Sequence, residues 1–224
     1  MPVSDLSAVA QDYLKLIWSA TEWEGDPVTV KQLAERMGVR AATVSDAIRR
    51  LTEQGLLKHE PYGGIELTEA GRRHAVQMVR RHRLIETFLV EQLGYGWDEV
   101  HDEAEVLEHA VSDDLVDRID RRLGHPDRDP HGDPIPTADG DPRRPEAVPL
   151  LAAPAGVPLT VARISDADPA VLRYLGERGL RLDALLTVDE HRAFAGDVTV
   201  RLGDATLVLG ETAAAAVWVA VTPV

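Results

Sequence analysis

The chain has 224 residues, of which 44% are hydrophobic and 28% are charged, a composition typical of a globular protein with one large domain or two to three small ones. It has no cysteine, which excludes a disulfide scaffold, a thiolate zinc finger, an iron–sulfur cluster and a cysteine nucleophile. No apolar run could span a membrane, and the first ten residues do not resemble a signal peptide, so we expect a cytoplasmic protein.

The formal net charge of −14 argues against a nucleic-acid partner for the chain as a whole, because DNA binding places lysine and arginine against phosphates. The charge is unevenly distributed, however. Residues 28–83 contain 11 Lys and Arg against 6 Asp and Glu, a local balance of +5, whereas the sequence on both sides is net acidic. This distribution indicates a DNA-contacting module joined to a part that attracts cations.

The N-terminal part predicts three helices and a hairpin. Apolar residues at helical spacing indicate a first helix over 5–22. Thr29 is a suitable N-cap for a helix over 30–37 that Gly38 ends, and a third helix runs from residue 40 or 41 to about 54. Strands at 56–60 and 65–68, joined by a turn at 61–64, complete a winged helix-turn-helix pattern.

Polar and small side chains are expected on the exposed face of the third helix, where they would reach base edges and phosphates in a major groove. The predicted DNA contacts are Arg40, Ala41, Thr43, Ser45, Asp46, Arg49 and Arg50. The alternative is a winged-helix module that binds a protein, because the arginines supply the right charge but do not establish base contacts.

The C-terminal two thirds predict further helices, a linker and a β-rich end. Helices are expected over 68–92 and from 97 or 98 to 123. Residues 125–149 hold seven of the 14 prolines and predict an extended linker. The remainder predicts a small β-barrel with strands at 158–164, 184–188, 197–202, 205–209 and 216–221 and a helix at 169–178. The predicted fold is therefore mainly α with a small β domain.

Two of the predicted helices carry carboxylates and imidazoles at helical spacing. They are His82 and Glu86 on one helix and His101, Glu105, Glu108 and His109 on the next. They flank the apolar stripe, where crowded carboxylates are unfavourable unless a cation neutralises them. Because eight residues of helix span roughly 12 Å, we expect two sites, one with Glu105, Glu108 and His109 and one with His82, Glu86 and His101.

The competing interpretation of these helices is an ordinary acidic face with two surface histidines. The other histidines are interpreted as surface or turn residues without a metal role: His59, His74, His125, His131 and His191. Several apolar residues have no evident partner in so short a unit and are expected to form a two-fold dimer interface. They are Leu84, Phe88, Leu89, Leu93 and Val100.

A resemblance to a known family rests on stretches that follow the winged helix-turn-helix. They are His82-Arg83-Leu84-Ile85-Glu86, His101-Asp102-Glu103-Ala104-Glu105-Val106-Leu107-Glu108-His109 and the proline-rich His131-Gly132-Asp133-Pro134-Ile135-Pro136. Together they resemble the diphtheria toxin repressor (DtxR/MntR) family of metal-dependent transcriptional regulators, over nearly the whole chain. The resemblance implies a winged helix-turn-helix DNA-binding domain at 1–73, a helical metal-binding and dimerisation domain at 74–124, a linker at 125–156 and an SH3-like β-barrel at 157–224.

The resemblance also implies two metal sites. The primary site would consist of Asp12, Glu105, Glu108 and His109. The ancillary site would consist of His82, Glu86, His101 and Asp166, with Asp168 as the next choice for the ligand from the third domain.

The identity of the metal is inferred from positions at which this chain differs from other members of that family. Members regulated by iron usually carry methionine in place of Asp12 and cysteine in place of Glu105, and hard carboxylates in these places favour manganese. Iron(II) is the alternative, since carboxylates and imidazole also suit it. The two-domain manganese regulators carry glutamate where this chain has Lys15, so we expect two separate ions per chain rather than a paired cluster.

The function implied is a manganese-activated transcriptional repressor of metal-homeostasis genes that binds a double-stranded DNA operator as a homodimer and is not an enzyme. Three alternatives compete with it: an iron(II)-dependent regulator of the same family, a metal-independent winged-helix DNA-binding protein, and a metal hydrolase. A chelator would leave operator affinity unchanged in the second case. The third lacks a motif for a nucleophile or general base in a separate cleft.

Overall fold

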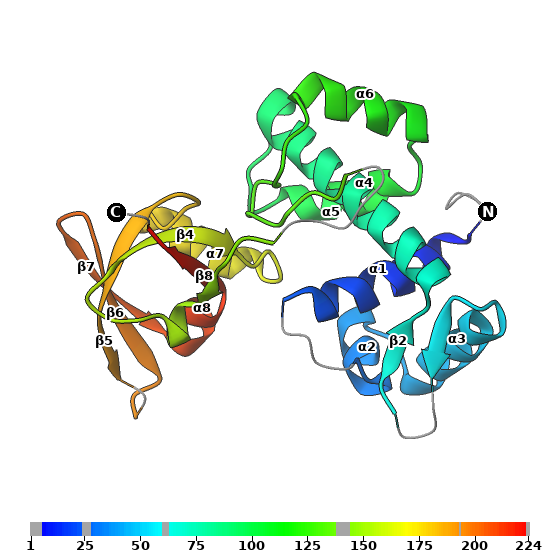
Figure 1. Ribbon diagram of the computed structural model, residues 1–224, viewed down its shortest axis with the longest axis horizontal. Helices are drawn as coiled ribbons and strands as arrows, with labels where there is room; N and C mark the ends of the chain where they lie inside the picture. The colour runs from blue at the N-terminus through cyan, green and yellow to red at the C-terminus, as the bar shows by residue number, and fades with distance from the viewer. Residues whose placement is uncertain (1–5, 24–27, 60–62, 138–143, 193, 223–224) are drawn as a thin grey trace. The chain divides into compact units, whose positions relative to one another are not determined.

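The computed structural model of the chain describes residues 6–23, 28–59, 63–137, 144–192 and 194–222, and Figure 1 labels its helices and strands. The chain divides into two compact units. The first comprises residues 1–82, 108–111 and 136–141, and the second comprises residues 83–107, 112–135 and 142–224. No described helix is both long enough and apolar enough to cross a membrane.

The first unit contains the predicted winged helix-turn-helix. Helix α1 (Ala8–Glu22) is capped by Ser7, and α2 (Val30–Met37) begins with a capping box and ends at Gly38, whose φ of +63° is a left-handed value that glycine adopts without strain. Helix α3 (Ala41–Glu53) follows, and then the antiparallel pair β1 (Leu57–His59) and β2 (Ile65–Leu67). The predicted turn at 61–64 lies partly outside the described residues.

One apolar core joins the elements of this module. Its fully buried side chains include Leu14 and Ile17 of α1, Leu33 of α2, Val44 of α3 and Ile65 of β2. Helix α1 therefore shares a core with the recognition helix α3, so a restraint on α1 restrains α3 through packed side chains.

The long helix predicted up to residue 123 is wrong, because the chain forms two helices there. Helix α4 (Glu69–Leu93) is followed by α5 (Val100–Glu108) and α6 (Asp113–Leu123). Ser112 has extended backbone angles, and its hydroxyl oxygen accepts a hydrogen bond from the amide of Leu115. A serine that caps a new helix ends the periodic pattern of the previous one.

The prediction of an extended linker is also wrong for residues 127–135. The Oδ1 atom of Asp129 accepts hydrogen bonds from the amides of His131, at 2.8 Å, and Asp133, at 2.9 Å. Gly132 has a φ of +91°, and a Cβ there would lie 2.2 Å from the carbonyl oxygen of Ala162 in β4 (Pro158–Ile164). Glycine therefore lets this loop, the 127–135 loop, pack directly against the β domain.

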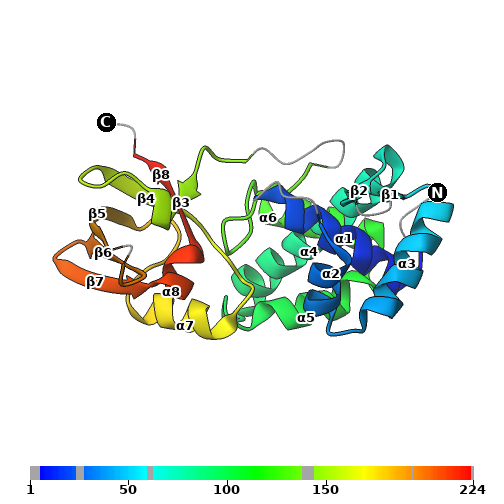
Figure 2. The same cartoon turned by 90° about the horizontal axis from the view of Figure 1, so that it is seen from below.

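The β domain is a six-stranded antiparallel sheet in the order β3-β8-β4-β5-β6-β7. Besides β4, its strands are β3 (Val148–Pro149), β5 (Leu185–Arg192), β6 (Asp197–Leu202), β7 (Ala205–Gly210) and β8 (Val217–Val221). Helices α7 (Pro169–Glu177) and α8 (Glu211–Ala215) accompany the sheet (Figure 2), and a short helix η2 (Leu150–Ala152) follows β3. The five predicted strands are present, whereas β3 and α8 were not predicted.

Candidate metal centres and DNA-binding face

The first ligand group joins Asp12 of α1 with Glu108 and His109 at the end of α5, and their ligand-capable atoms lie within 4.8 Å of one another. His109 Nε2 lies 2.9 Å from Asp12 Oδ1 and 3.6 Å from Glu108 Oε1. On the other side of the ring, His109 Nδ1 lies 2.8 Å from Oε1 of Gln11. Because an amide oxygen only accepts, Nδ1 carries the proton, and a neutral His109 presents the Nε2 lone pair to the carboxylates. That donor set suits a divalent cation.

Glu108 is fully buried, and both of its carboxylate oxygens are engaged. Lys15 Nζ donates to Oε1 at 2.7 Å, and His82 Nδ1 lies 2.6 Å from Oε2. Arg81 donates to the backbone carbonyl of the same residue at 3.0 Å. Burial by itself raises the pKa of Glu108, but His82 and Lys15 outweigh it and hold that pKa below its usual value. Glu108 is therefore ionised at neutral pH.

Glu105 lies one helical turn before Glu108 on α5 and is partly exposed. Its Oε1 atom lies 3.5 Å from Nε2 of His101, one turn earlier. The helix thus carries Glu105 on the same stripe as the other predicted ligands.

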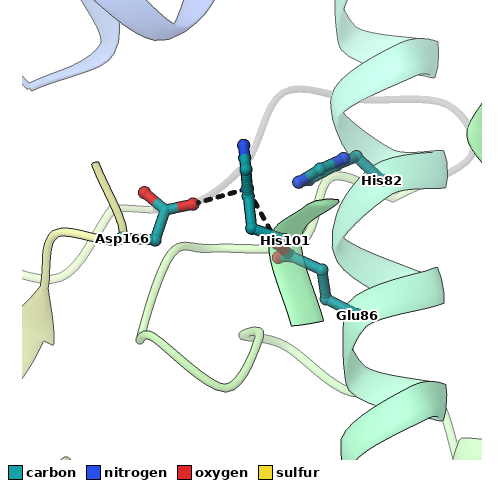
Figure 3. Close-up of side chains that lie close together, drawn as sticks. All are labelled: His82, Glu86, His101 and Asp166. Atoms are coloured by element: carbon teal, nitrogen blue, oxygen red, sulfur yellow. Dashed lines mark hydrogen bonds and ion pairs between the residues drawn. The ribbon is translucent and has the colours of Figure 1, made fainter. Parts of the chain in front are cut away.

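The second ligand group brings together Glu86 of α4, His101 of α5 and Asp166 of the loop after β4 (Figure 3). His101 Nδ1 lies 3.1 Å from Asp166 Oδ2 and 3.2 Å from Glu86 Oε1. Burial disfavours a charged imidazole, but the hydrogen bonds to Asp166 and Glu86 outweigh it and raise the pKa of His101 to about 10. His82 lies on α4 one turn before Glu86.

Asp168, the second choice for the third-domain ligand, has a different role. It is the N-cap of α7, and its Oδ1 accepts a hydrogen bond from the amide of Ala170 at 2.8 Å. Asp166 is therefore the aspartate of this loop that joins the second group.

Two residues near this group were missed by sequence reasoning. The ligand-capable atoms of Asp129 and His131 in the 127–135 loop lie within 4.8 Å of one another and of Glu86. His131 lies in a turn, as predicted, but the folded loop buries it completely, and His74 is also buried rather than on the surface. The available signal was the alternation of Asp129, His131 and Asp133 in a segment rich in glycine and proline.

The expected dimer residues are only partly available to a partner. Leu84, Leu89 and Val100 are buried within the chain, so the prediction that they lack an intrachain partner is wrong. Phe88 is half-buried and Leu93 is 60% exposed. Of the expected α4 residues, Phe88 and Leu93 therefore remain accessible to a partner.

The predicted DNA contacts all lie exposed on α3 or at its N-cap Arg40. The opposite face of α3 is buried. Arg49 pairs with Asp46 at 3.6 Å and with Glu53 at 3.0 Å on the same helix. Within the described part of the chain, Arg40 and Arg50 form no ion pair, so these two guanidinium groups can meet phosphates without first breaking one.

Three family models match successive parts of the chain. The N-terminal DNA binding domain of the iron dependent repressors matches residues 5–65, their metal binding and dimerisation domain matches residues 68–137, and the FeoA domain matches residues 148–221. The iron-dependent repressor IdeR of Mycobacterium leprae is 32% identical over 200 residues, which cover 84% of this chain and 86% of that protein.

Solved structures give the same assignment. A manganese-dependent transcriptional repressor in complex with manganese is 58% identical with a TM-score of 0.92, over 95% of this chain and 100% of that one. A second manganese-dependent transcriptional repressor is 53% identical with a TM-score of 0.78, over 94% of this chain and 98% of that one. The chain therefore belongs to the diphtheria toxin repressor (DtxR/MntR) family of metal-dependent, DNA-binding transcriptional repressors.

Proposed function

We propose that the protein is a manganese-activated repressor of metal-homeostasis genes, with iron(II) as the alternative metal. The observation that carries this proposal is the first ligand group, in which Asp12, Glu108 and His109 offer oxygen and nitrogen atoms and no sulfur. Oxygen-rich sites suit manganese, whereas thiolate and thioether ligands select softer metals. The manganese-dependent repressor that is 58% identical supports this choice.

Each ligand group would hold one ion. The primary site would use Asp12, Glu105, Glu108 and His109, and the ancillary site would use His82, Glu86, His101 and Asp166. A bound divalent ion would supply the positive charge that the clustered carboxylates need. Lys15 already pairs with Oε1 of Glu108, which supports one ion rather than two at the primary site.

Metal binding would act on DNA affinity through α1. Asp12 lies on this helix, and Leu14 and Ile17 of the same helix pack in one core with Val44 of α3. Holding Asp12 against Glu108 and His109 therefore restricts the element on which the recognition helix rests. The gain in DNA affinity cannot exceed the preference of the ion for the DNA-competent arrangement. Each increment of about 1.4 kcal/mol in that preference raises DNA affinity tenfold.

The DNA-bound form would be a homodimer on a pseudo-palindromic operator. The match of residues 68–137 to a metal binding and dimerisation domain supports it, as does the exposed face of α3. Two copies related by a two-fold axis would place two recognition helices in successive major grooves. The proposed domains are 1–73 for DNA binding, 74–124 for metal binding and dimerisation, a connection at 125–156 and the SH3-like domain at 157–224.

Operator binding with and without metal tests this proposal. Fluorescence anisotropy with DNA from upstream of the gene would be recorded anaerobically at fixed salt, with chelator, Mn²⁺ or Fe²⁺. We expect Mn²⁺-dependent binding that Glu105→Ala abolishes and that Glu103→Ala, an exposed acidic position on the same helix, retains. Equal binding in chelator would establish a metal-independent DNA-binding protein, and a stronger response to Fe²⁺ would establish the iron alternative.

The DNA-binding face has its own test. Arg50→Ala should weaken operator binding by about 1–3 kcal/mol if Arg50 contacts a base, or lower the salt dependence by about one ion if it contacts a phosphate. Lys31→Ala is the matched control, since Lys31 is an exposed cation on α2 outside the predicted contact set. Unchanged affinity and salt dependence in Arg50→Ala would contradict the assigned face.

A further inference from the structure

The loop between α4 and α5 attaches to the β domain through a tryptophan. Trp97 of this loop packs against the apolar core of that domain, to which α7 contributes Leu172 and Leu175. The indole lies against α7 at Gly176, where a Cβ atom would come within 3.2 Å of Trp97 Cζ2. The absence of a side chain at Gly176 therefore makes room for the tryptophan on the helix.

An ion pair accompanies this apolar contact. Asp98 Oδ2 lies 3.3 Å from Nη1 of Arg173, which precedes Gly176 by three residues on α7. The two side chains are 23% and 56% exposed, so solvent screens the pair and it contributes little to stability. The attachment of α7 to the loop therefore depends mainly on Trp97.

A short hydrogen-bonded turn joins Trp97 to His101 of the second ligand group. The amides of Glu99 and Val100 both donate to the carbonyl oxygen of Gly96 at 3.2 Å. The amide of Gly96 donates in turn to Oε1 of Glu99 at 3.0 Å. Because α5 begins at Val100, His101 follows this turn directly. The place of the indole is therefore tied to that of the imidazole.

The segment that carries Asp166 is joined to α7 in a similar way. Asp166 lies two residues before Asp168, whose Oδ1 caps α7 by accepting the amide of Ala170 at 2.8 Å. The amide of Ser165 donates to the carbonyl oxygen of Ala216 at 2.7 Å, which fixes the segment to the β domain. A contact that places α7 therefore also places Asp166.

This segment is held at both of its ends. At the β4 end, the amide of Ile164 donates to the carbonyl oxygen of His131 in the 127–135 loop at 2.9 Å. At the α7 end, Trp97 supplies the attachment. Between the two ends, Asp166 Oδ2 lies 3.1 Å from His101 Nδ1 (Figure 3).

We propose that Trp97 is a positioning residue of the second ligand group. By packing on α7 at Gly176, it holds Asp166 against His101, so the affinity of this group for a divalent ion depends on a side chain that does not ligate the ion. Residues that orient metal ligands typically change metal affinity by about 10- to 100-fold when they are replaced. The proposal rests on the proposed function only in taking the second group as a metal site.

The test is a double-mutant cycle on the affinity for Mn²⁺. Competition with a fluorescent chelator would be recorded on the full-length protein in an Asp12→Asn background, which weakens the proposed primary site. We expect Trp97→Ala and Asp166→Asn each to lower the affinity by about 10- to 100-fold. Because Trp97 acts through Asp166, the double variant should bind no more weakly than Asp166→Asn alone. Trp97→Phe, which retains an aromatic ring, should recover part of the loss.

Tyr95→Ala is the matched control. Tyr95 lies in the same loop, two residues before Trp97, and within the described part of the chain it does not belong to the apolar cluster of the β domain. Its replacement should leave the affinity for Mn²⁺ unchanged. If Trp97→Ala does not fold, as judged by near-ultraviolet circular dichroism, Gly176→Leu tests the same contact from α7, because a side chain there has to displace the indole.

Unchanged affinity in folded Trp97→Ala would overturn the proposal, as would additive losses in the double variant or full affinity in Asp166→Asn. Mn²⁺-dependent operator binding together with unchanged affinity in Trp97→Ala would contradict this role and leave the proposed function standing. Operator binding that does not respond to Mn²⁺, together with non-additive losses in the cycle, would contradict the proposed function and leave the role of Trp97 standing.

Discussion

The first and second ligand groups differ in the cation that balances their carboxylates. In the first group, His82 and Lys15 lie 2.6 Å and 2.7 Å from Glu108, and the charge of Lys15 belongs to a side chain that stays in place when a metal binds. In the second group, His101 lies between Glu86 and Asp166, and its positive charge comes from a bound proton. A metal ion can replace a proton outright, whereas it has to share Glu108 with the lysine.

This difference separates two roles that a metal-binding residue can have. Glu108 is part of a buried ion pair with Lys15, so losing one partner would leave an uncompensated charge whether or not a metal is bound. In the metal-free second group, protonated His101 balances the charge of the carboxylates. Metal binding would therefore exchange the proton on His101 for a metal ion. The predictions below test each half of this comparison.

The largest expected effect is the loss of Glu108. Glu108→Ala leaves Lys15, whose side chain is 12% exposed, without its buried carboxylate, and breaking such a pair from one side costs about 3–5 kcal/mol. Urea denaturation in excess chelator would measure the loss. Glu105→Ala, on the same helix but 38% exposed, should change the unfolding free energy far less.

A double variant separates the ion pair from the rest of the site. Glu108→Ala combined with Lys15→Met should recover much of the lost stability, because an apolar replacement of both partners avoids a buried unpaired charge. Equal stability of the unmodified protein and Glu108→Ala would show that the first group carries no structural ion pair.

Sequence reasoning reached the candidate ligands that helical spacing relates. The spacing of Glu105 and Glu108 is set by helix geometry, and His109 directly follows the last residue of α5, so their proximity follows from counting residues. Caps such as Thr29 and Gly38 likewise determine where helices begin and end from local chemistry. The DNA-binding module could be predicted for this reason.

Long-range packing set the limit of that reasoning. The burial of His131 depends on the contact of its loop with β4, and no periodic pattern in the sequence encodes that contact. The engagement of Glu108 by Lys15 joins residues 93 positions apart, and residue spacing along a single helix cannot reveal such a contact. The burial of His131 and the Lys15–Glu108 ion pair both affect the charge balance around the carboxylates, and this balance affects metal binding.

The next largest expected effect concerns the affinity of the first group for Mn²⁺. Lys15→Gln removes a fixed positive charge beside the site, and two unit charges 4 Å apart interact by about 4 kcal/mol at an effective dielectric constant near 20. Even if rearrangement offsets most of this, the affinity for Mn²⁺ should rise by at least about tenfold, or about 1.4 kcal/mol.

Competition with a fluorescent chelator would measure this change in a His101→Ala background, which weakens the second group. Lys31→Gln is the control, because Lys31 is exposed and pairs only loosely with Glu35, at 3.8 Å. A lower affinity in Lys15→Gln would mean that the lysine positions Glu108 for the metal rather than competing with it.

The smallest expected effect is the number of protons that the second group releases when it binds a metal. With its pKa raised to about 10, His101 is charged at pH 7.5 in the metal-free protein, whereas an imidazole that binds a metal is neutral. Metal uptake should therefore release about one proton, measurable by calorimetry in buffers of different protonation enthalpy, and His101→Gln should abolish this release. The raised pKa of His101 also contributes to the stability of the metal-free fold. This contribution is fully present below the pKa of about 6.5 that histidine has in the unfolded chain, and it is lost as the pH rises through 10. Proton release that persists unchanged in His101→Gln would show that the second group is balanced by a fixed cation, as the first one is.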